Sequence, residues 1–391
     1  MDIHIVSPND YGQIHRLRDY CFPNKYSGAR REDFHYWIEQ STTLGAYDDK
    51  KIVGQLLILP LNITVHGVSF KMGGIGFVAT YPEYRQQGII KRLMTEALQK
   101  MRDNGQTISV LAPFSVSFYR YFGWELFFEK LHYTIPQTMF PSLGKQVDDM
   151  KRMSFEWLDP VLFQMIKDFH NAQAIIRNGG MVRDDGWWKR LERRSPDSHF
   201  AAYFQGSNIE GYIRYTIRDG TFTIQDFIVA NLLAEQAMWR YMTSHAASVS
   251  SITGVTSNHY PFGFYFKEPQ FKREVIQDVM IRVVDVYAFM QQYPWKDIQE
   301  KLTIRIEDPF CLWNEHIYQI NKNGQVAIIE TSSVSDKHML TLPINLFSAM
   351  MAGYLSVKET VVYANQPTVE KVIEQWQWAI PTEKPAFYEY F

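Results

Sequence analysis

The chain has 391 residues, of which 46% are hydrophobic and 15% aromatic, enough for two to three domains with sizeable cores. Its 40 basic and 42 acidic residues nearly cancel, which argues against a general nucleic-acid or anionic-membrane binder. No stretch approaches about 18 uninterrupted apolar residues, and the first residues lack the apolar core of a secretory signal. Only two cysteines occur, Cys21 and Cys311, which suits a reducing cytoplasm.

Motifs for metal and hydrolase chemistry are missing from the sequence. The 11 histidines show no His-Glu-x-x-His or other paired spacing, and there is no Gly-x-Ser-x-Gly elbow. The basic run Lys189–Arg194 fits a solvated helix face better than a nucleic-acid site. We therefore expect no metal, no nucleic acid and no membrane among the partners.

The first third of the chain alternates helical and extended patterns, which predicts a mixed α/β sheet. The predicted helices are Tyr11–Cys21, Arg31–Gln40 and Gly88–Met101, and the predicted strands are Thr43–Tyr47, Ile52–Val65, Phe70–Thr80 and Ile108–Ala112. Pro60 predicts a bulge or irregularity in the second of these strands.

Residues 148–285 begin the same succession of elements again. The run Phe227–Ala230 and the apolar-periodic helix Leu232–His245 resemble Phe77–Thr80 and the helix that follows it. This similarity indicates an internal duplication of one fold. The second copy lacks the glycine and the arginine of the first.

After about Tyr287 the pattern changes to that of an α+β module. Its predicted strands are Leu302–Ile306, Ile317–Asn321 and Val326–Glu330, and its predicted helices are Leu346–Tyr354 and Thr368–Gln377. Asn323 and Gly324 predict a hairpin turn between the last two strands. The chain ends in an aromatic segment, Ala386–Phe391.

The most specific motif is a strand that runs into a turn and opens a helix at or near Gly88. The first N–H groups of a helix are unpaired and carry the positive end of its dipole. Gly88 lets an anion approach with no Cβ in the way, while Arg85 and Lys91 add cations. No Gly-Lys-Ser/Thr is present, so the pattern fits a pyrophosphate rather than a nucleotide P-loop. The alternative is a surface turn with solvated charges.

This stretch resembles the acetyl-CoA motif of the GNAT acetyltransferase superfamily, Arg/Gln-x-x-Gly-x-Gly/Ala, with Ile90 in place of the last small residue. Two aliphatic residues after the glycine are typical of the Eis (enhanced intracellular survival) branch. That branch also has an active GNAT domain, a degenerate second one and a sterol-carrier-protein-like domain, in this order. The resemblance implies that acetyl-CoA is bound by the strand edge, the turn and a residue pair after the next strand, namely Val78, Ala79, Thr80, Arg85, Gln86, Gln87, Gly88, Ile89, Ile90, Lys91, Phe114 and Ser115.

The run Tyr119–Gly123 is similar to the Tyr-x-x-Phe-Gly signature near GNAT active sites. By this resemblance Tyr119 is the general acid. A phenol with a pKa near ~10 stays protonated at neutral pH and can donate to the CoA sulfur as it leaves. The alternative is a tyrosine that only packs in the core.

Eis-like enzymes use the C-terminal carboxylate as the proton acceptor, which by position is that of Phe391. A free α-carboxyl group titrates near ~3.5, so direct deprotonation of an ammonium is costly. Three effects lower this cost. Burial beside aromatic rings raises a carboxyl pKa. A water molecule can relay the proton, and the amine becomes more acidic once it has attacked the carbonyl. The alternative is a frayed chain end, which would normally be polar rather than aromatic.

Acceptor-binding residues are expected on the two N-terminal helices, or the loop between them, which cover the acceptor cleft in GNAT folds. Tyr26, Tyr36 and Trp37 lie there, and Glu389 lies in the aromatic tail. Aromatic faces and carboxylates together bind cationic amines. The resemblance to Eis implies a polyamine-like or aminoglycoside-like acceptor.

We therefore expect an α/β (α+β) protein with tandem GNAT domains. Residues 1–145 form the catalytic domain that binds acetyl-CoA, residues 146–285 a degenerate second domain, and residues 286–391 a sterol-carrier-protein-like domain that supplies the C-terminal carboxylate. The expected reaction is direct transfer of acetyl to a primary amine of a small molecule or peptide. Two alternatives stay open: a tandem-GNAT acyl or aminoacyl transferase, and a non-catalytic acyl-CoA or lipid-binding protein. The resemblance also implies a homo-oligomer, specifically a hexamer.

Overall fold

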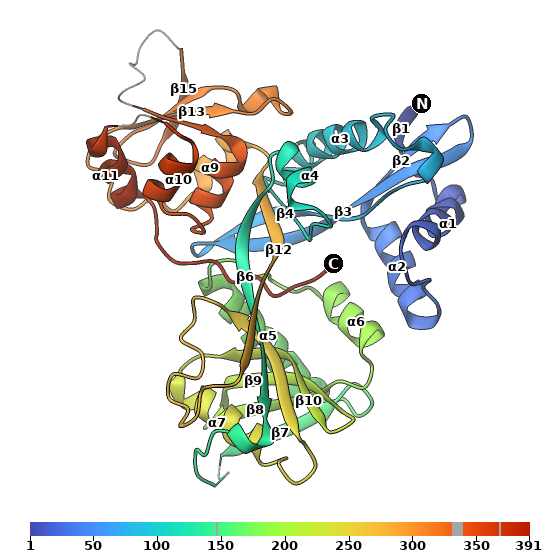
Figure 1. Ribbon diagram of the computed structural model, residues 1–391, viewed down its shortest axis with the longest axis vertical. Coiled ribbons are helices and arrows are strands. Elements are labelled where there is room, and N and C mark those ends of the chain that lie inside the picture. The colour runs from blue at the N-terminus through green and yellow to red at the C-terminus, as the bar shows by residue number, and fades with distance from the viewer. Residues whose placement is uncertain (146–147, 331–338, 367–368) are drawn as a thin grey trace. The chain divides into compact units, whose positions relative to one another are not determined.

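The computed structural model describes residues 1–391 except 146–147, 331–338 and 367–368. It divides into a first compact unit, made of Met1–Phe128, Arg177–Gly179 and Asp278–Phe391, and a second unit, made of Glu129–Ile176 and Gly180–Gln277. Helices and strands alternate in both, which confirms the mixed α/β class (Figure 1). The predicted domain boundary after residue 145 falls next to residues 146–147, which are not described. Thr368, predicted to begin the last helix, also lies outside the described residues.

The first unit contains a mixed sheet in the order β1-β2-β3-β4-β5-β12. Its strands are β1 (Asp2–Ile5), β2 (Thr42–Asp48), β3 (Lys51–Val65), β4 (Val68–Thr80), β5 (Ile108–Leu111) and β12 (Lys272–Val283, of which the part from Asp278 belongs here). Neighbouring strands are antiparallel except β4 and β5, which run parallel. Its helices before residue 128 are α1 (Tyr11–Cys21), α2 (Gly28–Gln40), α3 (Ile89–Asp103) and α4 (Val116–Tyr121). In Figure 1, α3 lies on one side of β3 and β4, and α1 and α2 lie on the other.

Helix α3 forms because its apolar residues recur every three or four positions. Leu93, Met94, Ala97, Leu98 and Met101 are completely buried against the sheet. Burial of a leucine-sized side chain stabilises the fold by about 1.5–3 kcal/mol. This one helix therefore anchors the turn that precedes it.

The irregularity expected near Pro60 lies elsewhere in β3. The register of β3 with β4 is regular from Leu57 to Val65, and it shifts between Gln55 and Leu57. β2 begins with Thr42 opposite Ile58, so no residue of β2 lies opposite Pro60 and its missing N–H costs no ladder hydrogen bond on that side.

The last part of the first unit is an α+β module with the sheet order β15-β14-β13-β16. Its elements are α8 (Val286–Gln292), β13 (Leu302–Glu307), β14 (Ile317–Ile320), β15 (Val326–Ile329), β16 (Leu340–Pro343), α9 (Ile344–Met351), α10 (Val357–Tyr363) and α11 (Glu370–Ala379). The predicted hairpin is confirmed, because β14 and β15 pair antiparallel and Gly324 has a φ of 76°.

The second unit has the sheet order β6-β11-β10-β9-β8-β7. Its elements are β6 (Glu125–Pro136, from residue 129), β7 (Asp149–Ser154), α5 (Pro160–Ile176), α6 (Asp185–Arg194), β8 (His199–Gln205), β9 (Asn208–Arg218), β10 (Thr221–Val229), α7 (Leu232–Thr243) and β11 (Ser251–Ser257). β10 pairs antiparallel with β9, precedes α7 and runs parallel to β11. β4, α3 and β5 have the same arrangement, which confirms the predicted duplication.

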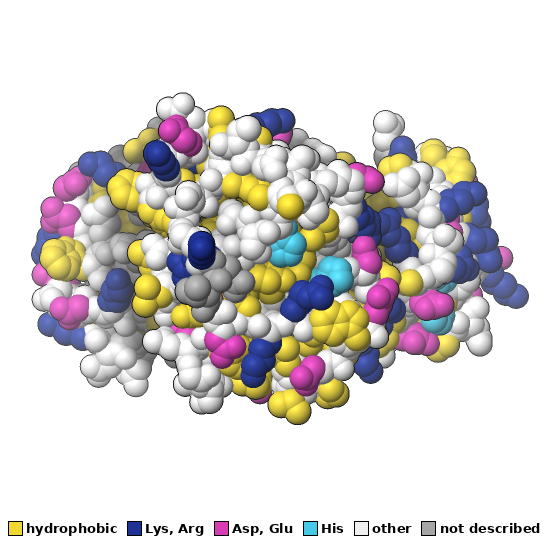
Figure 2. Space-filling model, turned by 90° about the horizontal axis from the view of Figure 1, so that it is seen from below, with side chains coloured by type: hydrophobic (Ala, Val, Ile, Leu, Met, Phe, Trp, Pro, Cys, Tyr) yellow, Lys and Arg dark blue, Asp and Glu magenta, His cyan; other side chains and the backbone are white. Residues whose placement is uncertain are grey.

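Charged side chains of both signs are interspersed with apolar ones on the surface face shown in Figure 2. This mixed surface agrees with the formal net charge of −2. A bound anion must therefore be held by a local arrangement of donors.

Candidate active site

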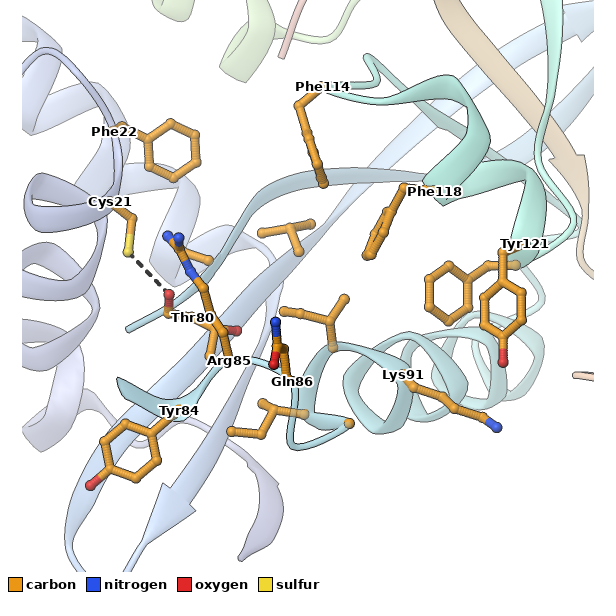
Figure 3. Close-up of a pocket in the computed structure, with 16 residues that line it drawn as sticks. Cys21, Phe22, Thr80, Tyr84, Arg85, Gln86, Lys91, Phe114, Phe118 and Tyr121 are labelled. Carbon is orange, nitrogen blue, oxygen red and sulfur yellow. Dashed lines mark hydrogen bonds between the residues drawn. The ribbon is translucent and has the colours of Figure 1, made fainter. Parts of the chain in front are cut away.

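A cavity of about 770 Å³ lies in the first unit at the start of α3 (Figure 3). The predicted CoA-binding residues that line it are Val78, Ala79, Thr80, Arg85, Gln86, Gly88, Ile89, Ile90, Lys91 and Phe114. The structure thus brings together the predicted strand edge, the turn and the segment after β5. Hereafter this space is called the α3 cavity.

One wall of the α3 cavity forms where β4 and β5 part. Their parallel pairing ends at Ile75 and Leu111, whereas β4 continues to Thr80. Phe77 has a φ of 55°, and Phe77 and Val78 together oppose a single residue of β3, which is a β-bulge. The end of β4 therefore turns its edge groups away from a regular ladder and toward the cavity.

The turn before α3 presents a row of main-chain donors. Gln86 and Gly88 both have left-handed backbones, with φ values of 62° and 74°. The first helical hydrogen bond runs from Arg92 N–H to Gly88 O, so the earlier N–H groups have no partner within the helix. A Cβ added at Gly88 would meet nothing within 4 Å, which shows open space in front of the turn. Such an arrangement is an anion-binding site.

The charges that line the cavity suit the same ligand. Arg85 and Lys91 line it, and none of its lining residues, all in the described part of the chain, is acidic. Cys21 also lines it and donates from Sγ to Thr80 O at 3.5 Å. Burial raises the pKa of the Cys21 thiol, an effect that nearby Arg85 partly offsets. The site is positive, and its thiol stays neutral.

Tyr119 lies behind the cavity wall rather than in it. Its side chain is 3% exposed and its ring packs against Phe114 and Phe118, with centroids 5.5 and 5.1 Å away. Burial raises the pKa of the Tyr119 phenol above its ordinary value of 10. The group is therefore protonated at every physiological pH.

Two predicted contact residues have other partners. Ser115 is the N-cap of α4, and its Oγ accepts from Phe118 N–H at 3.4 Å. Gln87 donates from Nε2 to Glu83 O at 3.2 Å. Neither lines the α3 cavity.

Six residues that line the cavity were not predicted from the sequence: Cys21, Phe22, Tyr84, Phe118, Tyr121 and Phe122. The aromatic run after β5 was the available signal for the last three. In Figure 3, Cys21 and Phe22 lie on one side of the turn, and Lys91 and Tyr121 lie on the other.

The aromatic tail is packed against the first unit. Phe387 is 1% exposed and packs against Phe127, with ring centroids 5.9 Å apart. A Cβ added at Gly74 of β4 would lie 2.8 Å from Phe391 Cε2, so the last ring covers β4. Gly74 directly precedes Ile75, the last residue of β4 that pairs with β5.

Hydrogen bonds to the main chain and side chain of Asn178 hold the start of the tail and the residues just before it. Ala386 N–H donates to Asn178 O at 2.8 Å, and Asn178 Nδ2 donates to Glu383 O at 2.7 Å. Asn178 Oδ1 also accepts from His66 N–H at 3.1 Å, directly after β3. The tail is thereby tied to the sheet that carries the cavity.

The predicted acceptor residues lie outside the α3 cavity. Tyr26 packs under the Arg18 guanidinium, 3.3 Å from its ring centroid, and Trp37 is 3% exposed with its ring against Tyr36. Glu389 lies in the tail, between Phe387 and Phe391 in the sequence. None of the four lines the cavity itself.

In the second unit the helix that corresponds to α3 is α7, and side chains of its own cap and first turn lie at its start. Asn231 caps α7, where its Oδ1 accepts from Ala234 N–H at 2.9 Å. Glu235, 2% exposed, adds an acidic group in the first turn of α7. This helix start is therefore a poor site for an anion.

In the part of the chain that the structure describes, no three His, Cys, Asp or Glu residues are grouped as a metal site. Across the same residues, no helix combines the length and apolar character that crossing a bilayer requires.

Three family descriptions match successive parts of the chain. Residues 2–127 and residues 179–283 each match an acetyltransferase (GNAT) domain, and residues 286–388 match a sterol carrier protein domain. The chain belongs to the GNAT acetyltransferases. The predicted tandem GNAT architecture and its C-terminal domain, hereafter the sterol-carrier-like domain, are confirmed.

Similar proteins agree with this assignment. An uncharacterized N-acetyltransferase of Streptomyces avermitilis is 22% identical over 325 residues, 77% of each chain. A probable N-acyltransferase of Enterococcus faecalis has a similar structure, with a TM-score of 0.90 and 26% identity over 100% of this chain and 99% of its own. Eis1 from Mycobacterium abscessus shares the fold, with a TM-score of 0.84, 15% identity and full coverage of both chains.

Proposed function

We propose that this acetyltransferase moves the acetyl group of acetyl-CoA to a primary amine by direct attack. The observation that carries the proposal is the left-handed turn at Gln86 and Gly88, which aims free N–H groups at the α3 cavity beside the parted strands β4 and β5. A pyrophosphate needs such donors, and a pantetheine arm needs an open strand edge.

The residues of the cavity fit the parts of CoA in order. The N–H groups of Gly88 to Lys91 would hold the diphosphate, with Arg85 as a forked cation. Val78 to Thr80 would pair with the amides of the arm through their strand-edge groups. Bound acetyl-CoA supplies the thioester carbonyl that the amine attacks.

Tyr119, whose ring packs against Phe114 of the cavity wall, would support the departing sulfur in this proposal. The phenol is a weaker acid than usual because it is buried, so it acts as a hydrogen-bond donor to negative charge on the sulfur. Stabilisation of this kind typically contributes about 10²–10⁴-fold to a rate.

The proton of the attacking amine would pass to the carboxylate of Phe391. Support comes from the packing of the Phe391 ring on Gly74, close to the point where β4 and β5 part. A carboxylate beside aromatic rings binds a proton more readily than one in water. One glycine added after Phe391 is expected to lower turnover sharply and to leave CoA affinity unchanged.

We further propose a cationic amine acceptor, such as a polyamine-like or aminoglycoside-like compound. Its support is the resemblance to Eis, together with the aromatic side chains of Tyr26 and Tyr36 and the carboxylate of Glu389. The hexamer and the cytoplasmic location also stay predictions. So do the roles assigned to residues 1–145, 146–285 and 286–391.

A CoA-release assay tests the proposal. The protein ending at Phe391 is incubated with acetyl-CoA and a panel of polyamine, aminoglycoside and peptide amines, and free thiol is measured. Amine-dependent release is expected. CoA binding without release for any amine would favour a non-catalytic acyl-CoA carrier, and absence of CoA binding would refute the proposal.

A further inference from the structure

We propose that the sterol-carrier-like domain sets the affinity for the adenosine end of CoA, through a loop that supports the wall of the α3 cavity. The loop is Asp308–Asn314, and its acting residue is Phe310. This inference rests on the proposed use of acetyl-CoA. It assigns to the third domain a part in cofactor recognition.

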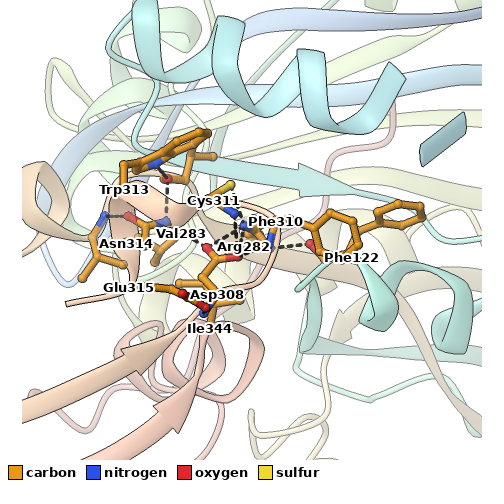
Figure 4. Close-up of polar contacts among 12 residues, drawn as sticks. Phe122, Arg282, Val283, Asp308, Phe310, Cys311, Trp313, Asn314, Glu315 and Ile344 are labelled. Carbon is orange, nitrogen blue, oxygen red and sulfur yellow. Dashed lines mark hydrogen bonds and ion pairs between the residues drawn. The ribbon is translucent and has the colours of Figure 1, made fainter. Parts of the chain in front are cut away.

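The loop is fastened by a buried ion pair (Figure 4). Arg282 at the end of β12 donates to both carboxylate oxygens of Asp308, at 2.8 and 2.7 Å, and both side chains are 0% exposed. Arg282 also donates to Cys311 Sγ at 2.9 Å and to Phe122 O. One guanidinium thus joins the loop to the main chain directly after α4.

Asp308 in turn shapes the loop from inside. Its Oδ1 accepts from the N–H groups of Phe310 and Cys311, at 3.3 and 3.2 Å. Its Oδ2 accepts from Asn314 Nδ2 at 2.9 Å. Cys311 is 0% exposed and belongs to the same core cluster as Leu93 of α3. The loop is therefore fixed in place as a part of that core.

Phe310 contacts Tyr121 and Phe122, two residues of the cavity wall. Its ring centroid lies 5.1 Å from that of Tyr121 and 5.2 Å from that of Phe122, and both of these residues line the α3 cavity. Lys91 Nζ lies 5.6 Å from the Phe310 ring. Tyr121 is 59% exposed, so its ring is available to a ligand. Phe310 does not line the cavity and acts through these neighbours, as a positioning residue.

The position of this cluster along the cavity identifies the end of CoA that it meets. The parted strands near Val78 and Phe114 form one end, and the anion-binding turn lies between them and Lys91. If the diphosphate occupies the turn and the arm follows β4, the adenosine 3′-phosphate extends toward Lys91 and Tyr121. An aromatic face stacks on a purine, and an ammonium group binds a phosphate.

A second contact links the same domain to α4. Arg120 donates to both carboxylate oxygens of Glu125, at 2.7 and 3.0 Å, and Asn345 Nδ2 donates to Glu125 Oε2 at 2.9 Å. Asn345 lies at the start of α9. The helix that carries Tyr121 is therefore linked to the sterol-carrier-like domain at two places, through Phe310 and through Asn345.

Titration calorimetry with two ligands tests the inference. CoA carries the adenosine 3′-phosphate, and 4′-phosphopantetheine lacks it. We expect Phe310→Ala to weaken CoA binding about tenfold, the size of one lost stacking contact, and to leave 4′-phosphopantetheine binding unchanged. Tyr121→Ala should show the same pattern, and the double variant should lose little more than either single one because the two residues act together. Leu312→Ala is the matched control, since this 70% exposed residue lies in the same loop.

The outcomes separate this inference from the proposed function. An equal loss for both ligands in Phe310→Ala would show a purely structural role and overturn the inference, as would unchanged CoA affinity. Wild-type protein that binds no CoA would refute the proposed function itself. In steady-state assays, Phe310→Ala should raise the KM for acetyl-CoA and leave kcat unchanged.

Discussion

Replacing Gly88 by alanine separates backbone strain from ligand binding. Gly88 has a φ of 74° and a ψ of 9°, a left-handed conformation that costs an alanine about 1–2 kcal/mol. No atom lies within 4 Å of the added Cβ, so the unliganded protein suffers no clash. For a unit of this size, a loss near ~1 kcal/mol lowers Tm by about 2–4 °C.

The effect on CoA should be larger than the effect on stability. The new methyl group stands where a phosphate must approach the N–H groups of the turn. Loss of one charge-assisted hydrogen bond costs about 1.5–3 kcal/mol, which raises Kd about 10- to 150-fold. Calorimetry with CoA measures this change, and a thermal melt measures the stability.

Gly67→Ala is the matched control for this prediction. Gly67 lies in the turn between β3 and β4, has a φ of 84° and also has no atom within 4 Å of an added Cβ. It should lose similar stability and keep its CoA affinity. Equal CoA affinities in Gly88→Ala and Gly67→Ala would refute the role of the turn.

Three further predictions concern the phenol, the buried ion pair and a buried histidine. Tyr119→Phe should lower kcat about 10²–10⁴-fold in the CoA-release assay with unchanged CoA affinity, and an unaltered kcat would exclude Tyr119 as the donor. Asp308→Ala should destabilise the protein by about 3–5 kcal/mol in denaturant melts because it leaves Arg282 buried without its carboxylate, whereas Glu300→Ala, which removes an exposed pair with Lys371, should leave Tm almost unchanged. Burial lowers the pKa of His66 from 6.5 to about 4, so the unfolded chain binds a proton between these pH values that the folded chain does not. Stability should therefore fall as pH falls through this window, by up to about 3 kcal/mol, and His66→Gln should flatten that part of the profile; a His66→Gln profile as steep as the wild type would assign the pH dependence to other groups.

Much of the first unit follows from local patterns in the sequence. The helix predicted over Tyr11–Cys21 has the observed bounds of α1, and the one predicted over Gly88–Met101 differs from α3 by one or two residues at its ends. The turn at Gly88 could be predicted because its chemistry depends on adjacent residues. Amphipathic spacing and a glycine in a tight turn are local signals.

The rest depends on contacts that no local pattern records. No sequence motif marks Arg282, Asp308 or Cys311. Only the fold brings them together, where Arg282 donates to Asp308, to Cys311 and to Phe122 O. The cavity-lining role of Tyr121 depends on how α4, a helix of six residues, docks on its neighbours. Phe391 and Gly74 are far apart in the sequence, but the Phe391 ring packs on Gly74 in the fold. This contact explains why the tail is aromatic, which its composition alone does not.

A crystal structure of the acetyltransferase with bound CoA tests the central claim most directly. The account predicts diphosphate oxygens within hydrogen-bond distance of the N–H groups from Gly88 to Lys91, with the pantetheine arm along Val78 to Thr80. CoA bound elsewhere on the molecule, with this turn empty, would contradict it.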